Sequence, residues 1–556
     1  MRKIWFAGGL FLLILGLLMV TNCFNRPTAD LAIVNARIWT GNPAQPWAEA
    51  LTVKAEQIIG VGDYAQVKSQ ITSRTRVLDL GGRFVCPGFI DAHVHFIEGG
   101  FHLTQVQLRD ARTKAEFVAR VKAFAAKCAP GEWITGGDWD HSLWGGTLPE
   151  RDWIDAVTPH NPVWISRLDG HMALANSLAL QAAGIDRHTP AVEGGTIVRD
   201  RTGEPTGILK DNALYLVEKV IPQPTMSQKS NALMAAMRYV AQQGVTAVHH
   251  MGGWDDLAVF EQTRKAGQLI TRISAAVPLG TWEDLTKKIK REGRGDHWLR
   301  YGTVKGFVDG SLGSHTAAFF EPYCDTGQDS GLLVNTPADL YALISASDKA
   351  GLQVAIHAIG DRANRLLLDI YERVSTENGG KDRRFRIEHA QHLSPADIPR
   401  FAALGVIASM QPYHCIDDGR WAERFIGHQR CMTTYAFRSL LDRHARLVFG
   451  SDWYVAPPTP LEGIYAALTR RTLDNKNPDG WIPEQKISLP EALQAYTLDA
   501  AYASFEEKLQ GSLEIGKLAD LVVLNRNLFQ ISPETINQVL VDMTIVGGQL
   551  VYQRPD

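Results

Sequence analysis

The sequence contains few cysteines and almost no net charge. Its six cysteines include no C-x-x-C pair, and the five that follow Cys23 are an odd number, so they cannot all pair. We therefore expect them to be mostly free, buried thiols. The formal charge of −3, without a basic cluster, argues against nucleic acid as a partner.

Two nucleotide-binding motifs are also missing. No G-x-x-x-x-G-K-[ST] loop is present, which excludes the usual nucleoside-triphosphate site. Glycine-rich turns are scattered and never form a dinucleotide fingerprint. The length of 556 residues exceeds one ordinary domain, and it fits a large barrel with an accessory module.

The N-terminus predicts a membrane anchor or export signal over residues 1–27. Arg2 and Lys3 precede an uncharged run over residues 4–20, long for a signal peptide and near the lower limit for a spanning helix. The basic pair should stay in the cytoplasm, which places the rest in the periplasm or outside the cell. Lipidation at Cys23 is the alternative, although Asn22 is a poor residue before such a site.

The rest of the chain changes pattern twice. Residues 31–39 and 50–54 alternate apolar and polar side chains between glycine turns, which predicts antiparallel β structure. Residues 518–524 and 543–552 show the same pattern. Between these ends, strand-like runs alternate with helical ones such as residues 227–243 and 337–349, as a β/α barrel requires.

The run Pro87-Gly-Phe-Ile-Asp-Ala-His93-Val-His95 is the most informative segment. On a strand, residues two apart point to the same side, so His93 and His95 project together. Two imidazoles at a strand end make half of a metal site. Asp91 faces the same side; it either orients a ligand or caps a loop.

Further polar residues occupy the ends of later apolar runs. In parallel α/β barrels the carboxyl ends of the strands form the catalytic face. A lone buried histidine is usually a hydrogen-bonded core residue, but several such ends are hard to explain that way. They therefore favour a metal site built from His93, His95, Lys305, His357, His389 and Asp452.

These motifs resemble the amidohydrolase superfamily, and more closely its amidohydrolase-3 branch, the group similar to N-substituted formamide deformylase. The resemblance covers most of residues 30–556 and implies a (β/α)8 TIM-like barrel. A small β-sandwich built from residues 28–85 and 505–556 would join that barrel, which would span 86–504 with an insertion within about 100–240. The segments include PGFIDAHVH, GGDWDHSLWGG, DGHMALANS, VKGFVDGSLGSHTAAFFEPY, IHAIGDRANRLLLDIYE, RIEHAQHL, MQPYHCIDD, FGSDWYVAPPTPLEGIYAALTRR and GSLEIGKLADLVVL.

The resemblance implies two divalent metal ions, for which zinc suits the imidazole and carboxylate ligands. One ion would be held by His93, His95 and Asp452, and the other by His357 and His389. Lys305 would bridge them as a carbamate, because a free ammonium offers no lone pair and repels a cation. The alternative is a lysine paired with Asp309 or another acid.

Paired metals would make hydroxide available near neutral pH, and that hydroxide would attack a carbonyl carbon. Asp452 would accept its proton and pass it to the leaving nitrogen. We expect His171 to lie behind the ligands or to stabilise an oxyanion; a structural histidine is the alternative. Substrate-pocket candidates are Trp139, Asp140, His141 and His414. The insertion's tryptophans are either core residues or substrate contacts.

The predicted activity is hydrolysis of a non-peptide C–N bond, of amide or formamide type, in a small-molecule substrate. Alternatives are a mononuclear deaminase-type enzyme, ester or lactone hydrolysis, and a non-catalytic regulatory relative. Lys305 discriminates, since a mononuclear enzyme needs no bridging carboxylate. A homodimer is left open.

Overall fold

The computed structural model describes residues 27–167, 172–192, 195–211, 213–313 and 315–555. The predicted N-terminal anchor lies almost wholly outside these residues. Among the residues described, no helix has the length and apolar character that a membrane span requires. The described residues form two compact units, one made of those up to 95 together with those from 237 onward, and the other of those between 96 and 236.

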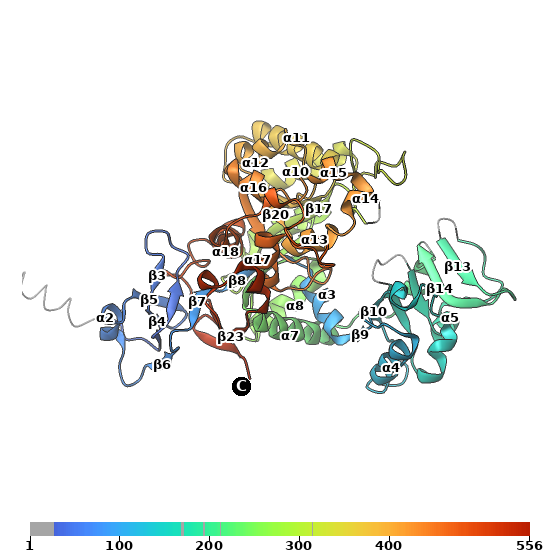
Figure 1. Cartoon of the computed structure of the whole chain (residues 1–556), viewed down its shortest axis with the longest axis horizontal. Coiled ribbons are helices and arrows are strands. Elements are labelled where there is room, and N and C mark those ends of the chain that lie inside the picture. The colour runs from blue at the N-terminus through green and yellow to red at the C-terminus, as the bar shows by residue number, and fades with distance from the viewer. Residues whose placement is uncertain (1–26, 168–171, 193–194, 212, 314, 556) are drawn as a thin grey trace, which may run out of the picture. The chain divides into compact units, whose positions relative to one another are not determined.

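The larger unit contains a (β/α)8 TIM-like barrel, which confirms the predicted fold class (Figure 1). Its last strand returns to the first, because Asp452 N donates to His93 O at 2.7 Å and His95 N donates to Trp453 O at 2.6 Å. The parallel strands follow the order β8 (Phe89–Val94), β15 (Val245–Met251), β16 (Arg272–Pro278), β17 (Leu299–Phe307), β18 (Gln353–Ala358), β19 (Arg386–His389), β20 (Ile407–Met410) and β21 (Arg446–Phe449).

Helices cover the outside of the barrel, and neighbours in sequence lie side by side there (Figure 1). Helix α10 (Pro337–Lys349) begins where the Thr336 side chain accepts a hydrogen bond from Asp339 N, with proline at the first helical position. Helix α11 (Asp361–Glu377) buries one apolar face that includes Leu367, Tyr371 and Val374. Other helices of this layer are α8 (Trp254–Lys265), α9 (Trp282–Glu292), α12 (Ile398–Leu404) and α16 (Phe437–Asp442).

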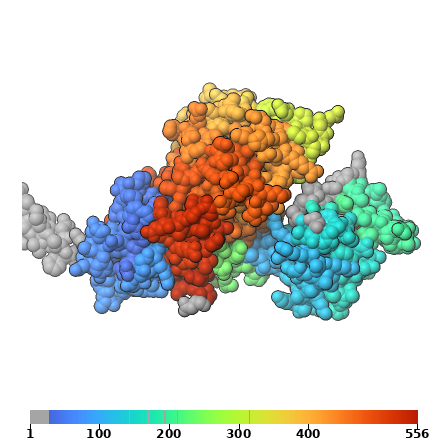
Figure 2. All heavy atoms as spheres, in the orientation of Figure 1, coloured from blue at the N-terminus to red at the C-terminus, as the bar shows by residue number. Residues whose placement is uncertain are grey.

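Two further sheets are built from the ends of the chain, and the second combines strands from both ends, whose residues are neighbours in Figure 2 (blue and red). Strand β7 (Phe84–Pro87) pairs antiparallel with β22 (Leu521–Leu524), with Val85 opposite Val523. The inner faces of the two sheets share one apolar core. The first sheet has the order β5 (Gln57–Gly62), β4 (Ala50–Lys54), β1 (Leu31–Val34), β6 (Arg76–Asp79). The second has β24 (Gln549–Gln553), β23 (Val541–Val546), β22 (Leu521–Leu524), β7 (Phe84–Pro87), β2 (Arg37–Trp39), β3 (Trp47–Ala48).

A buried arginine ties these sheets to the barrel. Arg272, at the start of β16, is 2% exposed, and its Nε and Nη2 donate to the two oxygens of Asp520 at 2.7 and 3.0 Å. Its Nη2 also donates to Glu56 at 3.3 Å. A buried ion pair that loses one partner leaves an uncompensated charge, which makes the remaining guanidinium destabilising.

We therefore expect Asp520→Ala to lower the free energy of unfolding by about 3 kcal/mol. Urea unfolding followed by circular dichroism measures this change. The control is Glu49→Ala, an exposed carboxylate near the same sheets, which should change stability by less than about 0.5 kcal/mol. Equal effects of the two variants would show that the Arg272 pair contributes little.

The smaller unit is built on one mixed sheet. Its strands follow the order β13 (Gly195–Arg199), β14 (Pro205–Asp211), β12 (Met172–Ala175), β11 (Trp164–Arg167), β10 (Gly136–Trp139), β9 (Val106–Gln107). Helix α4 (Lys114–Ala125) buries Phe117 and Val121 against the same core as Trp139 and Ile165.

The five described cysteines are free. Cys86, Cys415 and Cys431 are buried, Cys128 is half-buried and Cys324 is exposed. Burial raises the pKa of Cys415 to about 11, so this thiol stays protonated at neutral pH.

Candidate metal centre

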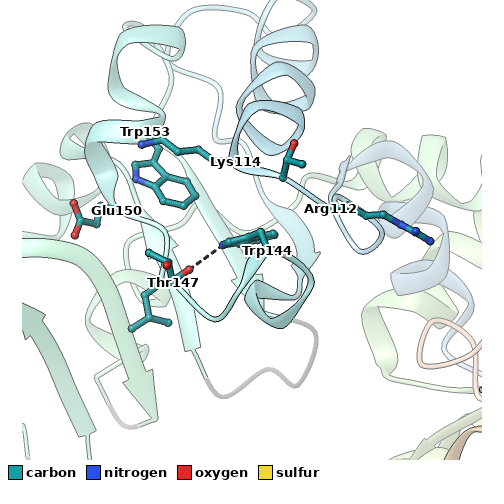
Figure 3. Close-up of a pocket in the computed structure, with 8 residues that line it drawn as sticks. Arg112, Lys114, Trp144, Thr147, Glu150 and Trp153 are labelled. Carbon is teal, nitrogen blue, oxygen red and sulfur yellow. Dashed lines mark hydrogen bonds between the residues drawn. The ribbon is translucent and has the colours of Figure 1, made fainter.

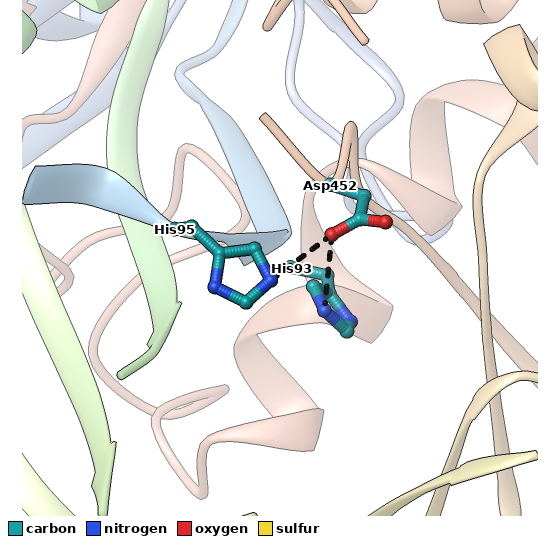
Figure 4. A group of neighbouring side chains, drawn as sticks. All are labelled: His93, His95 and Asp452. Carbon is teal, nitrogen blue, oxygen red and sulfur yellow. Dashed lines mark ion pairs between the residues drawn. The ribbon is translucent and has the colours of Figure 1, made fainter. Parts of the chain in front are cut away.

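The carboxyl ends of β8 and β21 bring three predicted ligands together. Asp452 Oδ1 lies 3.4 Å from His93 Nε2 and 3.3 Å from His95 Nε2. Both rings point toward this carboxylate (Figure 4). The candidate ligand atoms of the three residues all lie within 4.8 Å of one another, so a single ion can reach them all.

A second group of donors shares the same carboxylate. His389 and His414 each offer a nitrogen within 4.8 Å of the other and of an Asp452 oxygen. His414 comes from α13 (Pro412–Asp418), and sequence reasoning had placed it in the substrate pocket. His357, predicted as a partner of His389, lies beside it with ring centroids 4.5 Å apart.

Lys305 completes the cluster from β17. Its Nζ lies 3.4 Å from His93 Nε2, and the residue is 6% exposed. Within the described ranges, no carboxylate oxygen lies within 4 Å of this amine. Asp309, the alternative partner, instead accepts backbone hydrogen bonds from Ala318, Ile359 and Gly360 at 2.8, 3.0 and 2.8 Å.

Hydrogen bonds fix the tautomers of three histidines. A ring nitrogen that faces an acceptor carries the proton, and the other nitrogen keeps its lone pair for a metal. His93 Nδ1 donates to Glu388 Oε2 at 2.6 Å, His357 Nε2 to Gly310 O at 3.0 Å, and His389 Nδ1 to Gln411 Oε1 at 2.9 Å. Each imidazole therefore has one nitrogen left to bind an ion.

The same histidines are held neutral. Burial, and then the charge of Lys305, lower the pKa of His93 to about 4 and that of His357 to about 3. Burial and neighbouring His357 lower the pKa of His389 well below its ordinary value. Burial also lowers the pKa of Lys305. Metal binding requires deprotonated ligands, so this environment favours it.

The ion pair between Arg386 and Glu388, which the sequence analysis did not predict, holds the carboxylate that accepts the hydrogen bond from His93. Arg386 Nε and Nη2 donate to the two oxygens of Glu388 at 2.6 and 3.1 Å, and all three side chains are buried. Burial alone would raise the pKa of Glu388, but Arg386 and His93 lower it well below its usual range. Arg386 also donates to Ala92 O at 2.6 Å and to His249 Nδ1 at 3.0 Å.

Two of the ligand positions have unusual backbone conformations. Neighbouring strand residues face opposite sides, yet Glu388 and His389 both contribute to this cluster. His389 has a φ of 72° and Asp452 a φ of 59°, in the left-handed region that non-glycine residues rarely adopt. Such strain persists where the surrounding structure enforces it, which is common at functional sites.

Asp91 holds the segment that carries Asp452. Its Oδ1 accepts a hydrogen bond from Ser451 N at 2.8 Å, and its Oδ2 accepts one from Ser451 Oγ at 2.6 Å. Ser451 immediately precedes Asp452, so Asp91 positions a ligand from the neighbouring strand.

The remaining predicted pocket residues belong to the smaller unit. Trp139 is buried there, and its indole N–H donates to Ile165 O at 2.9 Å. Asp140 lies 3.5 Å from Arg167 Nη2, and His141 Nδ1 accepts from Arg167 Nε at 3.3 Å. Their substrate role stays a prediction, and His171 lies outside the described residues.

The smaller unit also has a hollow of its own, with a volume of about 670 Å³. Figure 3 shows the indoles of Trp144 and Trp153 there, with Lys114 Nζ 4.3 Å from the centre of the Trp153 ring. Phe117 packs edge-on against both tryptophans, so they are also part of this unit's core.

Residues 76–552 match the model of the amidohydrolase family. The chain belongs to this family. Protein LONG AFTER FAR-RED 3 of Arabidopsis thaliana is 42% identical over 538 residues, which are 94% of this chain and 92% of that protein. The N-substituted formamide deformylase of Arthrobacter pascens is 29% identical over 549 residues, 94% of this chain and 98% of the deformylase.

A solved structure agrees with this assignment. An uncharacterized metal-dependent hydrolase from Pyrococcus furiosus superposes with a TM-score of 0.75 at 29% identity, covering 91% of this chain and 99% of that one. The family match and this structural likeness, with the donor cluster, make the chain a metal-dependent hydrolase.

The donors of this amidohydrolase suit a divalent ion. Imidazoles and a carboxylate are the ligands that catalytic zinc sites use. An ion held there would lower the pKa of a water and polarise a carbonyl group. His93, His95 and Asp452 form one candidate site, and His389, His414 and Asp452 the other.

We expect Glu388→Gln to weaken metal binding by about 10–100-fold, because the carboxylate that orients His93 and increases its basicity is lost. Competition with a chelator of known affinity measures this change. Glu283→Gln, an exposed carboxylate on α9, is the matched control and should bind metal normally. Unchanged metal affinity in Glu388→Gln would mean that His93 needs no orienting acid.

Proposed function

We propose that this amidohydrolase cleaves a non-peptide C–N bond, of amide or formamide type, in a small molecule, using two divalent ions. The observation that carries the proposal is the position of Asp452, which belongs to both groups of candidate ligands. A carboxylate shared between two sets of imidazoles suits a pair of ions. Zinc suits these imidazole and carboxylate ligands.

We further propose that Lys305 is carbamylated. Its amine lies among the metal-ligand candidates and has no carboxylate within 4 Å in the part of the chain that the structure describes. An ammonium there would oppose two dications, whereas a carbamate offers two anionic oxygens. The addition of CO2 to the neutral amine forms an N–C bond and releases one proton.

The chain's own residues account for the proton transfers. Asp452 accepts a proton from the attacking water and returns it to the leaving nitrogen as the C–N bond breaks. The hydrogen bonds to Glu388, Gly310 and Gln411 keep the ligand imidazoles of His93, His357 and His389 in place while negative charge builds up on the carbonyl oxygen. The formamide deformylase at 29% identity supports this bond type.

Two aromatic residues beside the cluster favour a substrate with an apolar substituent. Phe307, at the end of β17, is 41% exposed and lies 5.3 Å from His357 between ring centroids. Tyr454 is 44% exposed and lies 6.3 Å from His95. Half-exposed rings next to ligand histidines can pack against an apolar group of a bound substrate.

The test is elemental analysis of the purified protein together with a panel of N-substituted formamides, other amides and esters. We expect nearly two zinc-like ions per chain and the highest kcat/KM on an amide or formamide. Phe307→Ala should raise KM for substrates with bulky apolar groups, while Tyr64→Ala, an exposed ring in the N-terminal helix α2 (Tyr64–Val67), should not. A single ion, or activity confined to esters, would contradict the proposal.

A further inference from the structure

The barrel has a cavity at the end opposite the metal-ligand candidates. Its volume is about 180 Å³, and it is lined by the first residues of β17 and the residues around the start of β18, including Tyr301, Gly302, Leu352 and Gln353. Lys305 and His357 lie farther along these same strands, toward the carboxyl ends. From this cavity and its charges, we infer a binding site for a small oxyanion.

Four cationic side chains line the cavity, but only two of them have acidic partners. Lys381 Nζ and Arg383 Nε each lie 3.0 Å from Asp348 Oδ1. Arg294 and Arg300 have no carboxylate within 4 Å among the described residues. The cavity therefore has two uncompensated positive charges.

The other acids nearby do not neutralise this pair. Asp382, at the cavity wall, lies 2.9 Å from Arg384. Glu506 is buried and attracts Arg300 only from beyond 4 Å, while its Oε2 accepts hydrogen bonds from Gln510 at 2.8 Å and Ser504 at 3.4 Å. An oxyanion would supply the charge that these acids do not.

The chain holds Arg294 in place. Its Nη2 donates to Gly351 O at 2.7 Å, and its Nη1 lies against Gly302, where a Cβ atom would overlap it. Gly302 has a φ of 146°, which L side chains rarely adopt. The guanidinium therefore rests on a surface that only glycine leaves open.

A short turn brings the second arginine beside the first. Tyr301 N donates to Arg294 O at 3.1 Å, and Gly295 forms an antiparallel bridge with Arg300. Burial and the charge of Arg300 lower the pKa of Arg294, so the two guanidinium groups repel each other. An anion between them would remove this repulsion.

The donors and the volume limit the ligand. Guanidinium groups bind carboxylates and phosphates through paired hydrogen bonds. The cavity is smaller than the roughly 300 Å³ at which sites for drug-sized ligands begin. A phosphate ion or a short carboxylate fits these limits.

The test is isothermal titration of inorganic phosphate, and separately of succinate, into the full-length metal-loaded enzyme. We expect saturable binding of one equivalent of at least one of the two anions. The anion that binds more tightly shows whether the site takes a phosphate or a carboxylate. Arg300→Gln and Arg294→Gln should each weaken binding by about tenfold or more. Gly302→Ala should do the same without changing charge.

The control is Arg443→Gln, an exposed arginine on the barrel exterior, which should bind like the wild type. Circular dichroism verifies that each variant is folded, and Arg300→Gln leaves the glycine contact of Arg294 intact. No saturable binding of either anion would overturn the inference. Wild-type affinity in folded Arg294→Gln and Arg300→Gln would also overturn it, since it would place the anion elsewhere.

Discussion

Asp452→Asn should lower kcat by about 10⁴-fold and reduce the metal content, because the shared carboxylate and the proton acceptor are lost together. Asparagine has nearly the same shape and tolerates the left-handed conformation at this position, where φ is 59°. The loss of rate and metal would therefore result from the missing carboxylate and not from a change in the backbone. Steady-state kinetics and elemental analysis of the same preparation measure both effects.

The control for this variant is Asp442→Asn, an exposed aspartate of α16 that pairs with Arg438 on the surface. It should keep full activity and metal content. His93→Ala and His389→Ala, one from each group of candidate ligands, should each remove one ion and most of the activity. If Asp452→Asn retained both ions and the wild-type rate, Asp452 would be neither a ligand nor a proton acceptor.

Lys305→Ala should lose metal as well as rate, because the proposed bridge between the ions disappears. We expect kcat to fall by about 10³-fold or more, a loss comparable to removing a principal electrostatic contact of a transition state. Elemental analysis should show fewer ions per chain than in the wild type. The residue is buried, so thermal unfolding must confirm that the variant is folded.

Lys305→Glu is the informative partner of this variant. Its carboxylate can take the place of a carbamate, so it should retain more metal than Lys305→Ala. Short carboxylates added to the buffer should partly restore both metal and rate to Lys305→Ala, by filling the vacated position. Two ions and a wild-type rate in Lys305→Ala would show that Lys305 is not a bridging ligand and would favour a bridge made by water alone.

The grouping of the candidate ligands was largely predictable because its signals are local. Buried strands that end in His93, His357, His389 and Asp452 show the polar residue and the apolar run together. In a closed parallel barrel, such ends meet on one face whatever the loop lengths. The fold class followed from the alternation of strands and helices and from the family resemblance.

What the sequence did not reveal depends on backbone detail and long-range packing. The ion pair of Arg386 and Glu388 was visible as charged residues two apart on a buried strand, but only His389 was assigned to the site, because it ends the apolar run. The positive φ of His389 allows the consecutive residues Glu388 and His389 to face the same cluster, and no sequence pattern predicts this backbone conformation. His414 approaches Asp452 from a helix, so no strand-end rule could find it.

The pairing of β7 with β22 also affects how the chain is made. Val85 of β7 pairs with Val523 of β22, so β7 leaves the ribosome more than 400 residues before its partner strand is synthesised. Until then, β7 presents an unpaired apolar edge, the kind of surface on which nascent chains associate with one another. The barrel strands emerge in between, and β8 follows β7 directly, so the sandwich is completed only when synthesis is nearly finished. A chain whose synthesis stops before residue 521 would lack β22, and the exposed edge of β7 would make it a substrate for chaperones and proteases.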